Sequence, residues 1–380
     1  MNIKMIRNEN KIIRAVTVSQ SLGFCREIMI KMRDMGYEMI AVSSPGKELD
    51  IIKEQDSIPV YAVPMARHIS LKSDLVSLFN MVKVFRREKP YVVHSMTPKA
   101  GLICMMAGWL TGVPVRLHTF TGLVWPTSKG FKRKVLMMTD RLTCACATHI
   151  IPEGQGVLND LKNGRITRKP MKVLGYGNVR GVDMNQFNPA RFDVEKSDKF
   201  TFLFVGRIVG DKGINELVEA FTRLCGEYHN VQLLLVGNYE TDLDPVTQLT
   251  QERIKANPVI HADGPLHGDD LLKEYVKADC FVMPSYREGF PNTVLEAGAM
   301  GLPSIVTDIN GSREIIVNGK NGLIVPSKDA NALYEAMKSI LNDEEMRKQM
   351  AVNARPMIES RFEKNYVQNC LIEYYDVILK

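Results

Sequence analysis

Short apolar stretches alternate with helix-like segments along almost the whole chain. Strand-like runs fall at 12–18, 39–43, 59–63, 92–94, 115–119 and 149–151, and again at 200–205, 232–236, 259–262, 280–283, 304–307 and 323–325. Segments with helical periodicity separate them, for example 71–87, 129–145, 214–224 and 330–341. This alternation predicts an α/β protein with parallel sheets and right-handed crossovers. Two doubly wound sheets of about six strands fit the pattern better than one sheet of twelve.

A chain of 380 residues can form two domains with full cores. The segment 175–189, GYGNVRGVDMNQFNP, is rich in Gly, Asn and Asp and has no regular period. We therefore predict a first Rossmann-like domain over 1–177 and a second over 178–363. A C-terminal helix at about 364–380 is expected to pack back on the first domain.

The composition is that of a globular protein, with 45% hydrophobic and 24% charged residues. No apolar run reaches the roughly 18 residues expected of a membrane span. The first fourteen residues are polar and charged, so we expect no secretory signal. The seven cysteines are scattered and odd in number, which favours reduced structural thiols and a cytoplasmic location.

Positive charge is concentrated in the first half of the chain. Residues 1–190 hold 28 Lys and Arg against 14 Asp and Glu, a balance of +14, so the net charge of +6 leaves −8 for the remainder. Lys129, Lys132, Arg133 and Lys134 lie beside Trp125, Phe131 and Met138. Cations beside such side chains favour an anionic membrane surface. A solvated helix face is the alternative, and we expect no nucleic-acid partner because no binding motif accompanies the charge.

Glu288 and Glu296 lie eight positions apart in REGFPNTVLEAG. The first follows a strand-like stretch, and the second is expected about two turns into the next helix. Gly289 and Pro291 lie between them and suit close backbone approach to a ligand. The helix N-terminus there favours an anion. Carboxylates that bind hydroxyls, next to an anion site, predict binding of a sugar nucleotide.

Gly206 and Arg207 follow the strand 200–205, and Lys212 precedes the next helix. Two cations in a glycine-containing loop can bind a diphosphate, Arg bidentately and Lys as a point charge. An ordinary surface loop is the alternative. Because open α/β sheets bind ligands at the carboxyl ends of strands, we expect a site in a cleft between the two domains.

Three segments of the chain together resemble glycosyltransferase family 4: FVGRIVGDKGI, PSYREGFPNTVLEAGAMGLPSIVTD and GLIVPSKDANAL. Members of that family have the two-domain GT-B fold and use nucleotide sugars with retention. The resemblance implies that Glu288 binds hydroxyls of the donor sugar and Glu296 the ribose. Arg207 and Lys212 would bind the diphosphate, with Gly206 and Asn292 nearby. Backbone amides near Thr293 and Val294 would help to bind the diphosphate, and Gly289, Phe290 and Pro291 would offer amides to the sugar.

The first half contains candidates for the acceptor side. His118, in RLHTFTG, is expected at a strand end facing the cleft with Thr119 and Thr121; the resemblance implies contact with the donor, and a packed histidine is the alternative. His94 could line the same pocket, and Lys99 could bind an anion at a helix start. SQSLGFC contains one glycine, Gly23, where many relatives have a pair, so no particular role is assigned to it.

HTFTGLVW and SMTPKAGL are similar to the branch that builds bacterial capsule, O-antigen and linked glycans on undecaprenyl-diphosphate sugars. This implies a lipid-linked acceptor at the inner face of the plasma membrane. We expect a metal-independent enzyme without cofactors that transfers a sugar to this acceptor, with UDP-sugars favoured as donors. Asp242-Leu243-Asp244 matches a metal-binding D-x-D pattern, but we interpret it as solvated acidic surface. An epimerase or phosphorylase of the same fold, and a non-catalytic nucleotide-sugar-binding protein, remain alternatives.

Overall fold

The computed structural model describes residues 8–66, 70–240 and 244–379. These residues form two compact units, called here the first unit (Met1–Arg180 with Val367–Lys380) and the second unit (Gly181–Tyr366). The domain boundary was predicted after residue 177, and in the structure the chain passes from the first unit to the second between Arg180 and Gly181. Asp242 and Leu243 lie outside the described residues.

The first unit contains a six-stranded parallel sheet in the order β3-β2-β1-β4-β5-β6. Its strands are β1 (Asn8–Ala15), β2 (Glu38–Ser43), β3 (Val60–Ala62), β4 (Pro90–Met96), β5 (Val115–Phe120) and β6 (His149–Pro152). Ile12 and Ile13 are both fully buried although they point to opposite faces. Helices cover both faces, which is why the strands are continuous apolar runs.

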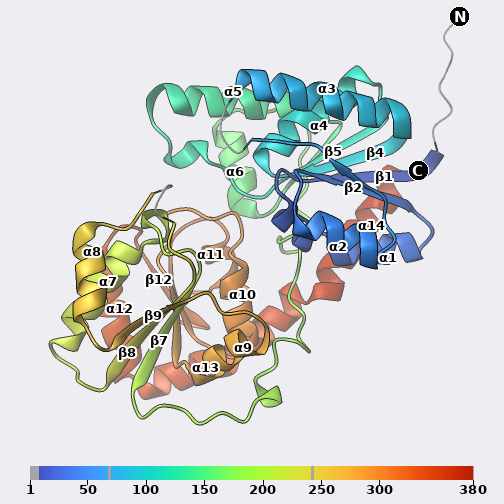
Figure 1. Ribbon diagram of the computed structural model, residues 1–380. Coiled ribbons are helices and arrows are strands. Elements are labelled where there is room, and N and C mark those ends of the chain that lie inside the picture. The colour runs from blue at the N-terminus through green and yellow to red at the C-terminus, as the bar shows by residue number, and fades with distance from the viewer. Residues whose placement is uncertain (1–7, 67–69, 241–243, 380) are drawn as a thin grey trace, which may run out of the picture. The chain divides into compact units, whose positions relative to one another are not determined.

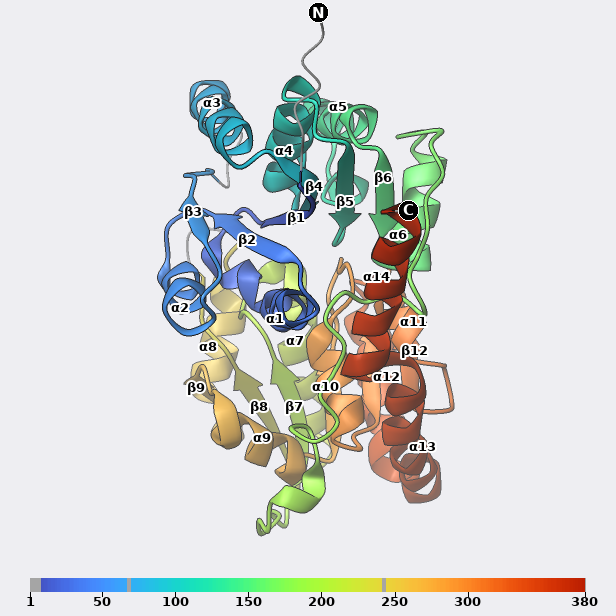
Figure 2. The same cartoon turned by 90° about the vertical axis from the view of Figure 1, so that its right-hand side faces the viewer.

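Helices α3 (Leu71–Glu88), α4 (Pro98–Leu110) and α5 (Gly130–Cys146) lie side by side over one face of this sheet (Figures 1 and 2). The other face packs against α1 (Arg26–Asp34), α2 (Lys47–Gln55) and α14 (Lys364–Ile378). From α14, Leu371, Ile372 and Tyr375 enter the same apolar cluster as Met29 and Ile52. The remaining helical segments are the 3₁₀ turns Ser19–Phe24 and Trp125–Thr127 and α6 (Gln155–Asn163).

The second unit repeats this winding with the order β12-β11-β10-β7-β8-β9. Its strands are β7 (Phe200–Val205), β8 (Val231–Val236), β9 (Ile260–Gly264), β10 (Cys280–Met283), β11 (Ser304–Thr307) and β12 (Gly322–Val325). In each unit the first and fourth strands are neighbours at the centre. The chain winds outward in opposite directions from this pair, so ligands are expected at its carboxyl ends. The prediction of two doubly wound parallel sheets of about six strands is confirmed.

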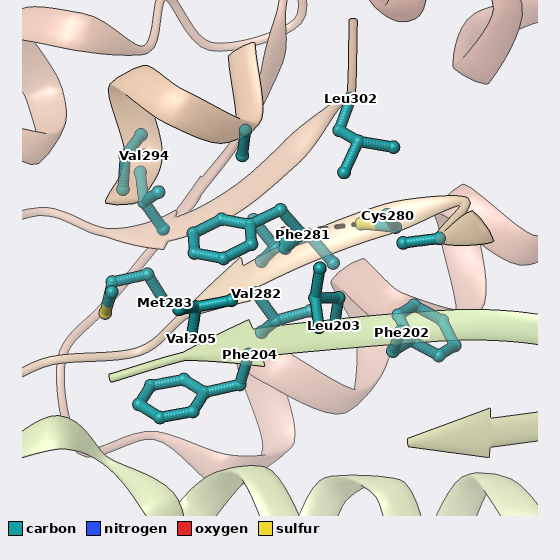
Figure 3. Close-up of a cluster of buried hydrophobic side chains, with 14 of the residues drawn as sticks. Phe202, Leu203, Phe204, Val205, Cys280, Phe281, Val282, Met283, Val294 and Leu302 are labelled. Carbon is teal, nitrogen blue, oxygen red and sulfur yellow. Dashed lines mark hydrogen bonds between the residues drawn. The ribbon is translucent and has the colours of Figure 1, made fainter. Parts of the chain in front are cut away.

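Aromatic side chains fill the core of the second unit. Phe202 and Phe204 on β7 and Phe281 on β10 are fully buried between the sheet and its helices (Figure 3). The helices are α7 (Ile214–Cys225), α8 (Gln248–Ala256), α9 (Gly268–Lys277), α10 (Asn292–Ala299), α11 (Ser312–Ile315), α12 (Ala330–Asn342) and α13 (Glu344–Phe362), with 3₁₀ turns at Pro189–Arg191 and Gly210–Lys212. A Cβ added at Gly298 would lie 2.7 Å from Cγ1 of Ile358, so α10 packs closely on α13.

The predicted first strand extends too far. β1 ends at Ala15 rather than at residue 18, because the Thr17 N–H donates to Oγ1 of Thr97 (3.0 Å) and the chain then turns into a 3₁₀ helix. Among the residues that the structure describes, no helix combines the length and apolar character needed to cross a membrane.

Candidate functional site

The loop after β7 is held against the segment after β10. Gly213 adopts a left-handed conformation (φ 72°), and a Cβ there would lie 2.0 Å from the carbonyl oxygen of Pro284. An L side chain meets both a backbone penalty and a collision at this position. The glycine therefore lets the turn Gly210–Lys212 lie directly against the segment that leads to Glu288.

The predicted cations of this loop each contact a carboxylate. Lys212 Nζ donates to Oε1 of Glu288, and the two side chains are only 17% and 14% exposed. Arg207 Nη1 donates to Oε2 of Glu240 at 2.7 Å, with exposures of 46% and 30%. The structure thus brings Arg207, Lys212 and Glu288 to the carboxyl ends of the central strands β7 and β10. Sequence reasoning did not identify Glu240.

Three further residues fix the turn around Lys212. Arg287 Nη2 donates to Asp211 (2.9 Å), and the Tyr286 N–H donates to the Asp211 carbonyl oxygen (2.8 Å). The carboxylate of Asp244 accepts a hydrogen bond from the Asp211 N–H at 2.6 Å, so this exposed aspartate also supports the loop. Asp211 and Arg287 are the direct sequence neighbours of Lys212 and Glu288. Their position next to Lys212 and Glu288 in the sequence could have identified them as residues that support the site.

Glu296 is the fifth residue of α10 and therefore lies in its second turn. This agrees with the expected position about two turns into the helix that follows Glu288. The Glu296 side chain is 8% exposed, and Oε2 accepts a hydrogen bond from the Tyr275 hydroxyl at 3.3 Å. Burial and the nearby Glu296 charge raise the pKa of Tyr275 well above its usual range, so Tyr275 remains the donor.

The segment between the two glutamates is closely packed. Phe290 is buried, with its ring 5.3 Å from that of Phe362, and Val294 is fully buried. The Gly289 carbonyl oxygen would lie 2.5 Å from a Cβ at Gly311, so the backbone is fixed there. Pro291 precedes α10 and has no N–H, so its predicted amide contact is wrong. Gly206, directly after β7, and Asn292 and Thr293, the first two residues of α10, are half-buried.

His118 lies within β5, in the interior of the first unit. It is 1% exposed, and its Nδ1 is hydrogen-bonded to Oγ of Ser95 at 2.9 Å. A Cβ at Gly101 would lie 2.4 Å from its ring. Burial lowers the pKa of His118 to about 3, so the imidazole is neutral at physiological pH. Within the first unit, these are the surroundings of a packed, hydrogen-bonded histidine.

His94 and Thr119 are also buried and contact each other. Nε2 of His94 bonds to Oγ1 of Thr119 (2.7 Å), and Nδ1 bonds to the Tyr375 hydroxyl of α14 (2.6 Å). The buried Arg14 contacts His94 Nδ1 as well. Burial, followed by the Arg14 charge, lowers the pKa of His94 well below its ordinary value. These groups connect the central strands of the first unit to α14.

Three acceptor-side candidates lie nearer the surface. Lys99 is the second residue of α4, and its ammonium lies 2.7 Å from both carboxylate oxygens of Asp74. Thr121 is half-buried just after β5. A Cβ at Gly23 would meet nothing within 4 Å, so protein packing does not require a glycine there. In the described part of the chain, no group of three or more His, Cys, Asp or Glu side chains is arranged to hold a metal ion.

Two family models match the chain, one for each unit. Residues 24–177 match the glycosyl transferase 4-like domain, and residues 187–357 match glycosyl transferases group 1. The chain belongs to glycosyltransferase family 4. It is 34% identical over 377 residues to the capsular polysaccharide biosynthesis glycosyltransferase CapM of Staphylococcus aureus, covering 97% of this chain and 98% of that protein.

A second curated relative supports this assignment, and a solved structure identifies the fold. The chain is 28% identical over 332 residues to the Escherichia coli UDP-Gal:alpha-D-GlcNAc-diphosphoundecaprenol alpha-1,3-galactosyltransferase, covering 81% of each chain. Sucrose-phosphate synthase from Thermosynechococcus elongatus superposes with a TM-score of 0.80 at 20% identity, over 97% of this chain and 99% of that one. The fold is therefore GT-B, as the resemblance implied.

Proposed function

We propose that this glycosyltransferase transfers a sugar, with retention, from a UDP-sugar to a lipid-diphosphate-linked glycan during surface polysaccharide synthesis. The observation that carries the proposal is the meeting of Arg207, Lys212 and Glu288 at the carboxyl ends of β7 and β10, with Glu296 on the adjoining helix. The names of the two relatives, one capsular and one acting on a diphosphoundecaprenol acceptor, support the acceptor class.

The assigned roles follow from the charge of each group. Arg207 and Lys212 would stabilise negative charge on the departing nucleotide diphosphate, usually the largest electrostatic contribution in such a reaction. Glu288 would accept hydrogen bonds from the donor sugar, and Glu296 from the ribose. Because Lys212 already bonds to Glu288, one ion pair would align the phosphate and the sugar together.

Retention is proposed to proceed by substitution on one face of the sugar through an oxocarbenium-like state. Glu288 is hydrogen-bonded to a cation and is better suited to hold hydroxyls than to attack carbon. The acceptor proton would pass to the leaving phosphate. We assign His118 no proton transfer, because it is buried and its pKa is lowered to about 3.

The donor site is tested by substitution of Arg207. Arg207→Ala is expected to weaken UDP binding about tenfold, as for loss of one charge-assisted contact in a solvated site. Arg191→Ala is a matched control, because Arg191 is a similarly exposed arginine in the same unit that pairs with Asp269 at 3.2 Å. Equal UDP dissociation constants for wild type and Arg207→Ala by calorimetry would contradict the assigned contact.

Glu288→Ala separates binding from turnover. We expect loss of sugar transfer, measured with a UDP-sugar and a diphosphate-linked acceptor, while UDP still binds. Near-wild-type transfer would refute the role of Glu288. Turnover that needs no acceptor, or that requires inorganic phosphate, would indicate an epimerase or a phosphorylase. We also propose that no metal takes part, so EDTA should leave the rate unchanged; a loss of rate restored by Mg²⁺ would contradict this.

We further propose that the first unit binds the cytoplasmic face of the membrane through the start of α5. Its first turn contains no acidic residue, and Phe131 there is 81% exposed. Sedimentation with anionic liposomes should be lost after glutamine replaces four cations, Lys129, Lys132, Arg133 and Lys134. The matched control replaces four cations of α1 and α2, Lys31, Arg33, Lys47 and Lys53. Equal sedimentation of the two variants would contradict this surface.

A further inference from the structure

A cavity of about 570 Å³ lies in the first unit among α3, α4 and α5. These three helices lie side by side over the sheet (Figures 1 and 2). The apolar part of its wall comes from Val18, Pro98, Leu102, Val124 and Leu136. The polar part comes from Thr17, Asp74, Thr97, Lys99, Lys132 and Thr139. A largely apolar cavity with a few polar groups is the usual form of a small-molecule site.

The cavity lies at the end of the sheet where α/β proteins bind ligands. Thr17, Thr97 and Val124 follow the carboxyl ends of β1, β4 and β5, and β1 and β4 are the central strands. Oγ1 of Thr17 bonds to Oγ1 of Thr97 at 2.7 Å and accepts from the Ala100 N–H at 3.1 Å. These contacts join the two loops at the wall of the cavity.

The charges on the wall are unequal. Lys99 is neutralised by Asp74, whose carboxylate oxygens lie 2.7 Å from its ammonium. Lys132 is exposed, and in the described ranges its ammonium forms no ion pair or hydrogen bond with another residue. The first turn of α5, which carries Lys132, contains no acidic residue. One side of this largely apolar cavity is therefore complementary to an anion.

Exposed apolar side chains lie on the helices that border this cavity. On α3 they are Leu71, Leu75 and Phe79, spaced four residues apart on one face, and Leu71 is 79% exposed. On α5 they are Phe131, Met138 and Leu142. Helices with large apolar residues beside Lys and Arg favour the boundary between headgroups and acyl chains.

We propose that this cavity binds the prenyl diphosphate end of the lipid acceptor. The first isoprene units would enter between Leu102, Val124 and Leu136, and the diphosphate would contact Lys132. The rest of the prenyl chain would leave along Leu71 and Phe131 into the bilayer. The inference rests on the proposed function, because the lipid-linked acceptor defines the ligand.

Farnesyl diphosphate, a soluble probe with both chemical features, tests the cavity by calorimetry in the absence of any donor. We expect it to bind at least tenfold more tightly than inorganic diphosphate, because the latter contributes only the charge. Leu136→Trp fills the cavity and should weaken farnesyl diphosphate binding at least fivefold. Lys132→Gln should weaken both probes about three- to tenfold, the range for a lost charge-assisted contact.

The control is Leu110→Trp, which adds the same ring to an exposed position at the end of α4, outside the cavity. Equal affinity of wild type and Leu136→Trp for farnesyl diphosphate would overturn the proposal. Equal affinity of wild type for farnesyl and inorganic diphosphate, or no binding of either, would also overturn it. Lys132→Gln keeps the test valid if Leu136→Trp fails to fold. UDP binding depends on the second unit's site and not on this cavity, so failure of the proposed donor site would be seen separately in UDP calorimetry.

Discussion

Replacement of Gly213 by alanine tests whether the close contact between the β7 and β10 loops builds the donor site. Gly213 and Gly319 are both in the second unit and both left-handed, with φ of 72° and 78°. A Cβ at Gly213 would lie 2.0 Å from the Pro284 carbonyl oxygen, whereas one at Gly319 would meet nothing within 4 Å. A comparison of Gly213→Ala with Gly319→Ala therefore separates the cost of a left-handed alanine from the cost of the collision.

The expected magnitudes follow from these two contributions. A left-handed alanine costs about 1 kcal/mol at either position. At residue 213 the backbone must also move by about 1 Å to relieve the contact, which adds about 1–3 kcal/mol, as overpacking does in cores. We expect a loss of about 1 kcal/mol for Gly319→Ala and about 2–4 kcal/mol for Gly213→Ala. The same movement would separate Lys212 from Glu288 and weaken UDP binding.

Urea unfolding and UDP calorimetry measure these effects. A chain with two compact units need not unfold in one step, but both substitutions fall in one unit and so affect the same transition. Equal destabilisation by the two variants would refute the collision. A Gly213→Ala protein that is destabilised but binds UDP normally would refute the link between the loop contact and the site.

Three more predictions test individual groups. Burial lowers the pKa of His118 to about 3, against about 6.5 in the unfolded chain, so the free energy of unfolding should fall as pH drops from 6.5 toward 3. His118→Asn should reduce the slope of the unfolding free energy against pH, between pH 6 and 5, by up to about 1.4 kcal/mol per pH unit. Equal slopes for the two proteins in urea unfolding would contradict this. Tyr375→Phe removes a hydroxyl that bonds to buried His94 and should cost about 1–3 kcal/mol in urea, whereas the neighbouring Tyr374→Phe should cost little; equal losses would argue against that bond. Glu240→Gln releases Arg207 from an exposed ion pair and should tighten UDP binding about two- to fivefold by calorimetry. If Glu240→Gln tightened UDP binding equally in a protein that already carries Arg207→Ala, the gain would not come from this ion pair.

The sheets could be predicted because parallel strands covered on both faces leave a direct record in the sequence. Cys280–Met283 is buried at every position, and it was recognised as a continuous apolar run. The end of β1 could not be predicted in this way. Apolar character continues to Val18, and it is the Thr17 contact with Thr97, distant in sequence, that ends the strand. A hydrogen bond across 80 positions leaves no local pattern.

The same limit applies to the candidate site. Glu288 and Arg207 could be located because both follow strands, and carboxyl strand ends gather at one edge of a sheet. The burial of His118 could not be predicted, because its surroundings come from Ser95 and Gly101 on other elements. A histidine near the end of a strand has the same sequence pattern whether it faces a ligand or the core.

The pairing of the cations changes how the donor site would work. Two unpaired cations would attract a diphosphate directly, but here Lys212 bonds to Glu288 and Arg207 to Glu240, so an incoming diphosphate must compete with carboxylates. The Lys212 pair is only 17% and 14% exposed and is weakly screened, so it should persist and keep Glu288 oriented toward the sugar. The Arg207 pair is 46% and 30% exposed, and such pairs contribute little stability. In the proposed donor site, Arg207 would therefore be the cation that exchanges its carboxylate for the phosphate at low cost, while Lys212 would orient Glu288, the residue proposed to bind the sugar.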